Sequence, residues 1–288
     1  MSRTQTALVL SGGGSLGAVQ VGMLQALSRA NLEVDLIVGA SVGALNGAFY
    51  ADDPTPEGAD RLANLWRGLR RKDVFPLTLW SGIKALLLGS DHLIEPTRLR
   101  RIIERTLHNA RFEDLPLPLH VVATNVLSGQ SVLLSTGEVE TALLASTAIP
   151  VVFPSVEIDG RHLVDGGVST NTPIASAVEL GAQRIIVLPT GMSCAMLEPP
   201  RNMAALALHV MGLQSMRQLD RDVAQYREHA RITVVPPLCP LSASVFDFSQ
   251  TAALIYRAAK QTYEWLGSGG LDSAGPLQVP LAHHHYRR

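Results

Sequence analysis

The sequence predicts an α/β protein in which a mainly parallel sheet is covered by helices on both faces. Short, largely apolar strand patterns at 6–10 and 34–38 alternate with helix patterns at 15–30 and 42–51. Apolar strands of this kind are typical of parallel sheets that are buried on both sides. The 288 residues are 47% hydrophobic and 17% charged, so the chain can bury a large core and is not a disordered protein.

The alternation of strands and helices resumes after a mainly helical insertion at about 57–110. The Asp159-Gly160 dipeptide is a favoured two-residue turn and predicts a hairpin over 156–164. The other predicted elements are strands at 119–125, 130–134, 184–188 and 232–235 and helices at 173–180, 203–227 and 250–266. We expect one domain over 1–288, with its core at about 6–190 and a C-terminal helical part at about 200–267.

Charge and cysteine content exclude several classes of protein. A formal net charge of -1 gives no electrostatic basis for binding nucleic acid. Cys194 and Cys239 have neither metal-site spacing nor a disulfide pattern, so we expect no metal, no cofactor and a cytoplasmic location. The apolar run at 7–10 is too short for a signal peptide, and no stretch is apolar enough to span a bilayer.

A glycine-rich loop follows the first predicted strand and opens a helix. Its letters, Gly12-Gly13-Gly14-Ser15-Leu16-Gly17, allow backbone N–H groups to face a negative charge, and they also fit a dinucleotide-binding pattern. A dinucleotide site needs an acid at the carboxyl end of the second strand, whereas Glu33 and Asp35 stand at its beginning. A tight turn without a ligand is the third alternative, and the loop alone does not choose among the three.

The segment Gly39-Ala40-Ser41-Val42-Gly43 has the G-x-S-x-G form at a predicted strand-to-helix junction. Such a turn holds a serine in a strained conformation and exposes its hydroxyl above the sheet. Glycines on both sides allow the strand and the helix to pack closely. The Val42 N–H lies at the start of a helix, where it can stabilise an oxyanion. A turn made of small residues without catalytic function is the alternative.

In the usual hydrolase triad the base is a histidine that comes after the serine and the acid in the sequence, so the histidines are the first candidates for the base of Ser41. None has a convincing setting: they lie within or at the end of a helix, at the amino end of a strand, in the hairpin or in the tail (His209, His229, His120, His162 and His283 to His285). Asp165-Gly166-Gly167, by contrast, ends a predicted strand. A partly desolvated carboxylate can accept the serine proton, although a solvent-exposed Asp-Gly turn is the simpler alternative.

These three elements, in this order, resemble the patatin-like phospholipase family. The similarity extends through ASTAIPVVFP at 145–154 and VEIDGR at 156–161, and more loosely through Ala123-Thr124-Asn125. It covers roughly residues 6–190. The resemblance implies a three-layer α/β/α fold and a Ser-Asp dyad without histidine, with Ser41 as nucleophile and Asp165 as base.

The resemblance also implies an oxyanion hole and a class of substrate. Gly12, Gly13 and Gly14 would supply its N–H groups. The family loop often carries a basic residue where this chain has Leu16, but backbone N–H donors do not depend on that side chain. The implied reaction is hydrolysis of phospholipid, lysophospholipid or neutral lipid esters through an acyl-serine. An acyltransferase on the same scaffold and a non-catalytic lipid-binding regulator are the alternatives.

The insertion offers a surface that could face lipid. It contains the apolar segments 75–80, with Trp80, and 85–88, which could form an acyl-binding wall that also contacts a membrane peripherally. A helix pair that buries this face in the core is the alternative. Arginines at 98, 100, 101 and 105 could attract anionic headgroups or could form an ordinary solvated helix face.

Overall fold

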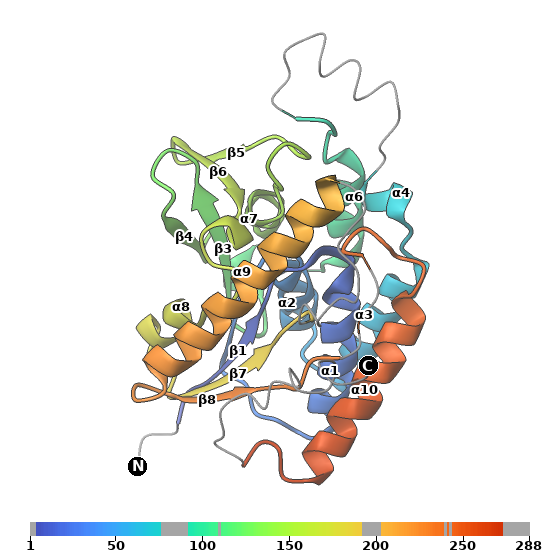
Figure 1. Ribbon diagram of the computed structural model, residues 1–288, viewed down its shortest axis with the longest axis vertical. Coiled ribbons are helices and arrows are strands. Elements are labelled where there is room, and N and C mark those ends of the chain that lie inside the picture. Colours follow the sequence, from blue (N-terminus) through green and yellow to red (C-terminus); the bar gives the residue numbers. More distant parts are fainter. Residues whose placement is uncertain are drawn as a thin grey trace, which may run out of the picture.

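A computed structural model describes residues 4–75, 92–108, 111–191, 203–238, 241 and 244–272 (Figure 1). Its centre is a sheet in the order β5-β6-β3-β2-β1-β7-β8, with β4 also paired to β3. The strands are β1 (Thr6–Leu10), β2 (Leu36–Ala40), β3 (Leu119–Asn125), β4 (Ser131–Leu134), β5 (Val156–Ile158), β6 (Arg161–Asp165), β7 (Arg184–Leu188) and β8 (Arg231–Val234). The five strands β3, β2, β1, β7 and β8 run parallel, which confirms the mainly parallel sheet.

Helices connect and cover these strands. They are α1 (Gly17–Arg29), α2 (Val42–Asp52), α3 (Pro56–Gly68), α4 (Arg71–Val74), α6 (Thr97–Thr106), α7 (Val139–Ser146), α8 (Ile174–Glu179), α9 (Met203–Tyr226) and α10 (Thr251–Gly267). Helix α7 was not predicted, because its eight residues (VETALLAS) make only about two turns, too few to show a helical period. The helix predicted from residue 15 begins at Gly17, after a 3-10 turn at Gly14–Leu16.

The sheet separates two apolar layers, because successive strand side chains point to opposite faces. Leu8 and Leu10 of β1 pack into the core that contains α1, α2, α3 and α10. Ala7 and Val9 pack into the other core, with α8 and the C-terminal part of α9. Figure 1 shows α1, α3 and α10 side by side, with α8 and α9 across the sheet from them. Three layers are therefore present, as the sequence predicts.

The region expected to be a helical insertion contributes to this core. In α3, Leu62 and Trp66 are buried in the same cluster as α1. In α6, Leu99 and Ile103 are buried while the arginines at 98, 100, 101 and 105 are exposed. Trp80 and residues 85–88, with Cys194, Cys239 and the tail histidines, lie outside the described residues. Among the described helices, none has the length and apolar character needed to span a membrane.

Candidate active site

Strand β3 brings Ser41 and Asp165 together. Along one edge it pairs with β2, whose last residue, Ala40, lies opposite Val122. It also pairs with β6, whose last residue, Asp165, lies opposite Ala123. Because β4 occupies the other edge of β3 over these residues, β2 and β6 share one edge and run toward each other. Ser41 directly follows β2, so the two side chains meet at adjacent positions of a single strand.

Ser41 occupies a strained turn between β2 and α2. Its backbone has φ 53° and ψ −127°, a conformation that costs a residue with a side chain about 1–3 kcal/mol. The flanking glycines are required by close contacts. A Cβ on Gly39 would lie 2.7 Å from the Ala44 N, and one on Gly43 would lie 2.3 Å from the Leu10 carbonyl oxygen. The sequence G-x-S-x-G therefore forms the sharp strand-to-helix turn that was predicted.

The side chains of Ser41 and Asp165 form a short hydrogen bond. The Ser41 Oγ donates to Asp165 Oδ2 at 2.6 Å, and the Gly167 N–H donates to Asp165 Oδ1 at 2.7 Å. Ser41 is 8% and Asp165 7% exposed, so both groups are largely removed from water. Gly166 cannot carry a side chain, since its Cβ would lie 2.2 Å from the Val122 carbonyl oxygen. The Asp-Gly-Gly turn thus fixes the carboxylate against the serine and is not a solvated turn.

The Asp165 carboxyl is a stronger base than an ordinary aspartate. Burial raises its pKa from the usual 3.8 to about 6, and the hydrogen bonds from Ser41 and Gly167 lower that pKa in part. Desolvation has this effect because it disfavours the charged form. The carboxylate is therefore still ionised at pH 7 and can accept a proton from the serine more readily than a solvated carboxylate can.

Among the described residues, no histidine side chain forms a hydrogen bond with Ser41 or Asp165. His120 is near the amino end of β3, opposite Val38, and His162 lies in the β5–β6 hairpin. His108 and His92 bond to acids elsewhere, Asp52 and Glu95 respectively (2.6 and 3.0 Å). The side chains of His209 and of the tail histidines lie outside the described part of the structure, so a dyad without histidine stays a prediction.

The acid required for a dinucleotide site is also on the wrong edge. Asp35 precedes β2, and its Oδ2 accepts a hydrogen bond from the Thr6 N–H at 2.7 Å. Both groups lie at the amino ends of parallel strands, whereas the glycine loop follows the carboxyl end of β1. A ribose bound near that loop could not reach this carboxylate, so the dinucleotide alternative has no support in the structure.

The glycine loop lies beside Ser41 but differs from the prediction at Gly12. The Gly12 N–H already donates to the Asn171 carbonyl oxygen at 3.0 Å, so in this conformation it cannot serve an oxyanion. Within the described residues, the backbone N–H groups of Gly13, Gly14 and Val42 donate no hydrogen bond to another backbone group. Gly14 and Val42 line the same cavity as Ser41. These three amides are therefore the remaining candidate donors.

Two segments that the sequence did not link to the loop hold it in place. Thr190, just beyond β7, donates its hydroxyl to the Gly12 carbonyl oxygen at 2.7 Å. The carbonyl oxygen of Val245 accepts the Ser15 N–H at 2.8 Å. Leu16 stands where the family often has a basic residue, and it packs partly buried against the apolar core. The region beyond residue 190 thus helps to shape the site, although no local motif indicates it.

Ser146, at the end of α7, supports the turn that carries Ser41. Its side chain is fully buried, accepts the Ser41 backbone N–H at 2.9 Å and donates to the Val122 carbonyl oxygen at 2.6 Å. The hydroxyl therefore connects the end of β2 to β3 at the point where Asp165 arrives. Its position in the segment ASTAIPVVFP was noted in the sequence, but no local pattern indicates this role.

Ser146→Ala is expected to lower kcat and stability together. The substitution leaves a buried N–H and a buried carbonyl without this partner, which costs roughly 1–3 kcal/mol. Urea unfolding and steady-state kinetics with a soluble ester measure both effects. Ser28→Ala is the matched control, since Ser28 is a buried serine of α1 that bonds locally to the Gln25 carbonyl oxygen. Equal kcat for Ser146→Ala and the control would contradict the positioning role.

An apolar cavity of about 60 Å³ opens at Ser41 between helices α2, α3 and α6 and the segment that follows α7. Its walls are almost entirely aliphatic and aromatic: Leu45, Phe49, Leu65, Trp66, Leu69, Val74, Phe75, Leu99, Ile102, Ile149, Phe153 and Phe248. Phe75 stacks on Phe153 and Trp66 on Phe248, with ring centroids 5.9 and 6.1 Å apart. An apolar lining with one polar edge suits a hydrocarbon chain attached to a reactive ester.

Comparison with known proteins identifies the family. A family model described as patatin-like phospholipase matches residues 8–178. The chain belongs to the patatin-like phospholipase family. The match includes the glycine loop, the Ser41 turn and Asp165, and it ends within α8.

The relatives of this patatin-like chain are longer proteins. It is 31% identical over 196 residues to the lysophospholipase NTE1 of Cryptococcus neoformans, with 65% of this chain and 11% of that protein covered. It is 30% identical over 188 residues to human patatin-like phospholipase domain-containing protein 6, with 64% and 13% covered. An uncharacterized NTE family protein of Mycobacterium tuberculosis is 30% identical over 187 residues, with 65% and 49% covered. The chain thus spans about half or less of the length of these relatives.

Solved structures agree on the fold of the patatin-like chain. Human GIVD cytosolic phospholipase A2 superimposes with a TM-score of 0.53 at 10% identity, covering 95% of this chain and 64% of that one. The same enzyme in complex with methyl gamma-linolenyl fluorophosphonate gives a TM-score of 0.51 at 12% identity, covering 94% and 59%. At such identities the likeness establishes the α/β architecture alone.

Proposed function

We propose that this patatin-like chain is a lipid acyl hydrolase that uses Ser41 as nucleophile and Asp165 as base. The observation that carries the proposal is the 2.6 Å hydrogen bond between these two buried side chains at the edge of an apolar cavity. The phospholipase and lysophospholipase names of its relatives support a lipid ester as substrate. We expect such a substrate to be reached at a membrane surface.

The proposed reaction has two matched halves. Asp165 Oδ2 accepts the hydroxyl proton as Ser41 Oγ bonds to the ester carbonyl carbon, and the N–H groups of Gly13, Gly14 and Val42 stabilise the oxyanion. As the carbonyl re-forms, the C–O bond to the alcohol breaks and Asp165 returns the proton to that alcohol. Water then attacks the acyl-serine in the same way, releasing a fatty acid and restoring the Ser41 hydroxyl.

Release of fatty acid from a defined lipid tests this function. Wild-type protein is expected to liberate fatty acid from lysophospholipid, phospholipid or monoacylglycerol, while Ser41→Ala is not. An added alcohol that captures most of the acyl group would favour the acyltransferase alternative. Wild-type protein that binds these lipids without cleaving any of them would favour the non-catalytic alternative.

The pH dependence of kcat/KM follows from the state of Asp165. The carboxylate must be ionised to accept the proton, and its pKa is about 6. We therefore expect kcat/KM to fall about tenfold per pH unit below about pH 6 and to be level above it. The measurement uses an uncharged ester, so that the protonation state of the substrate does not change with pH. A rate that stays constant from about pH 5 to about pH 8 would contradict Asp165 as the base.

A further inference from the structure

A second, larger cavity of about 510 Å³ adjoins the apolar one. It lies between the end of α3, the start of α4 and the segment that leads into α10. Leu69 and Phe248 line both cavities, so they form a shared wall. A ligand in the second cavity would therefore lie next to the pocket that contains Ser41.

Three arginines line this second cavity, and within the described chain none of their guanidinium groups forms a salt bridge, although the Asp73 carboxylate accepts the Arg70 backbone N–H at 2.9 Å. Arg67, Arg70 and Arg71 are exposed, and no salt bridge from them is formed within the described chain. The other arginines of the described surface include several that are paired with acids: Arg29 with Asp60, Arg61 with Asp53, Arg100 with Glu140 and Arg111 with Glu113. What distinguishes Arg67, Arg70 and Arg71 from the other arginines outside these ion pairs is that all three line one cavity.

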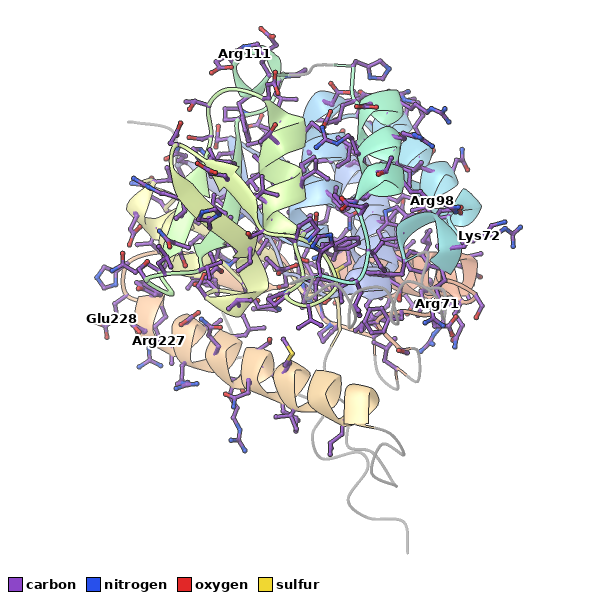
Figure 2. All side chains as sticks on the ribbon, turned by 90° about the horizontal axis from the view of Figure 1, so that it is seen from above. Arg71, Lys72, Arg98, Arg111, Arg227 and Glu228 are labelled. Atoms are coloured by element: carbon purple, nitrogen blue, oxygen red, sulfur yellow. The ribbon has the colours of Figure 1, made fainter. Side chains whose placement is uncertain are left out.

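The acid in the cavity wall does not neutralise these arginines. Asp247 Oδ1 accepts the Ser249 N–H at 2.8 Å, and hydrogen bonds with Ser249 lower the pKa of its carboxyl. It carries one negative charge, and three arginines line the same cavity. Further cations lie nearby: Figure 2 shows Arg71, Lys72 and Arg98 together at one edge of the molecule, where the Arg98 guanidinium donates to the Lys72 carbonyl oxygen at 2.9 Å.

We propose that this cavity is a phosphate-binding subsite for a phosphate-bearing lipid. Guanidinium groups bind phosphate oxygens in pairs of charge-assisted hydrogen bonds, and phosphate is the commonest anionic group of membrane lipids. The phosphate would lie among Arg67, Arg70 and Arg71 while apolar chain occupies the neighbouring cavity. The inference rests on the proposed function, since it takes the apolar cavity as the acyl site. The phosphate belongs either to the substrate itself or to a neighbouring lipid of the same surface.

The test measures binding to Ser41→Ala protein, so that it does not depend on hydrolysis. The two ligands are a short-chain lysophosphatidic acid and the monoacylglycerol with the same chain, both below their critical micelle concentrations. In this background we compare R67Q/R70Q/R71Q with the control R217Q/R221Q/R227Q, in α9 and directly after it, which removes the same charge from exposed positions outside the cavity. Figure 2 shows Arg227 far from Arg71.

The cavity variant is expected to lower the ratio of phosphate-ligand to neutral-ligand affinity about 10- to 100-fold, and the control by less than about threefold. Vesicles of phosphatidylcholine with and without phosphatidic acid distinguish the source. If the cavity variant binds the soluble phosphate ligand more weakly than the control does, the phosphate belongs to the substrate. If only its binding to the anionic vesicles is weaker, the phosphate belongs to a surface lipid. If the two variants change the affinity for phosphate-bearing ligands equally in both assays, the proposal is overturned, whether or not the wild type hydrolyses lipid.

Discussion

Ser41→Ala is expected to reduce ester hydrolysis by at least about 10³-fold, and Asp165→Asn by a similar factor. The double variant should be no slower than the slower single variant, because the two groups act in one proton transfer. Their 2.6 Å hydrogen bond is the structural reason for this non-additivity. Single-turnover kinetics with a chromogenic ester measure the acylation step directly.

Matched controls separate this effect from a general loss of structure. Ser128→Ala and Asp159→Asn make the same chemical changes at exposed positions, in the turn after β3 and in the β5–β6 hairpin. Both should keep wild-type rates. Losses that multiply in the Ser41→Ala, Asp165→Asn double variant would show that the two side chains act independently and would contradict a dyad.

Asp165→Asn is also expected to stabilise the folded protein at pH 7. Burial raises the pKa of this carboxyl from 3.8 to about 6, so the ionised form is disfavoured in the folded state. At about 1.4 kcal/mol for each tenfold change in acid strength, ionisation costs about 3 kcal/mol of stability at pH 7. An asparagine avoids that cost and can still accept the Gly167 N–H. We expect the free energy of unfolding to increase by up to about 3 kcal/mol.

The pH dependence of this stabilisation has a definite sign. Below the unfolded-state pKa near 3.8, Asp165 is protonated in both states and imposes no ionisation cost. The cost grows as the pH rises and is complete above about pH 6. Urea unfolding of wild type and Asp165→Asn should therefore differ most at about pH 7 and little at about pH 4. A variant that is less stable at pH 7, or a difference that does not change with pH, would argue against a desolvated carboxylate.

The parts of the site that the sequence predicted are those fixed by local backbone geometry. Ser41 has a positive φ, and a side chain at Gly39 or Gly43 would collide with α2 or β1. All of these requirements fall within five consecutive residues, so a local sequence motif can reveal them. Asp165 likewise depends on the Gly166 contact with β3. The parallel strands were predicted because burial on both faces demands continuous apolar runs.

The parts that were missed depend on contacts between residues distant in sequence. Ser146 is 105 positions from the N–H that it accepts, and Thr190 is 178 positions from the carbonyl to which it donates. The Gly12 N–H, which the sequence predicted to face an oxyanion, bonds instead to the carbonyl oxygen of Asn171, a residue that belongs to no motif of the loop. The shared wall of Leu69 and Phe248 arises only when α3 and the segment before α10 are packed together.

Labelling with a fluorophosphonate, followed by peptide mapping, tests the central claim most directly. The reagent forms a stable bond only with a serine whose proton is removed by a nearby base in a pocket that stabilises the phosphonyl oxygen. We predict one adduct, on Ser41, which forms much more slowly in Asp165→Asn and is absent in Ser41→Ala. An unmodified Ser41 in active wild-type protein, or labelling at an equal rate in Asp165→Asn, would contradict the account.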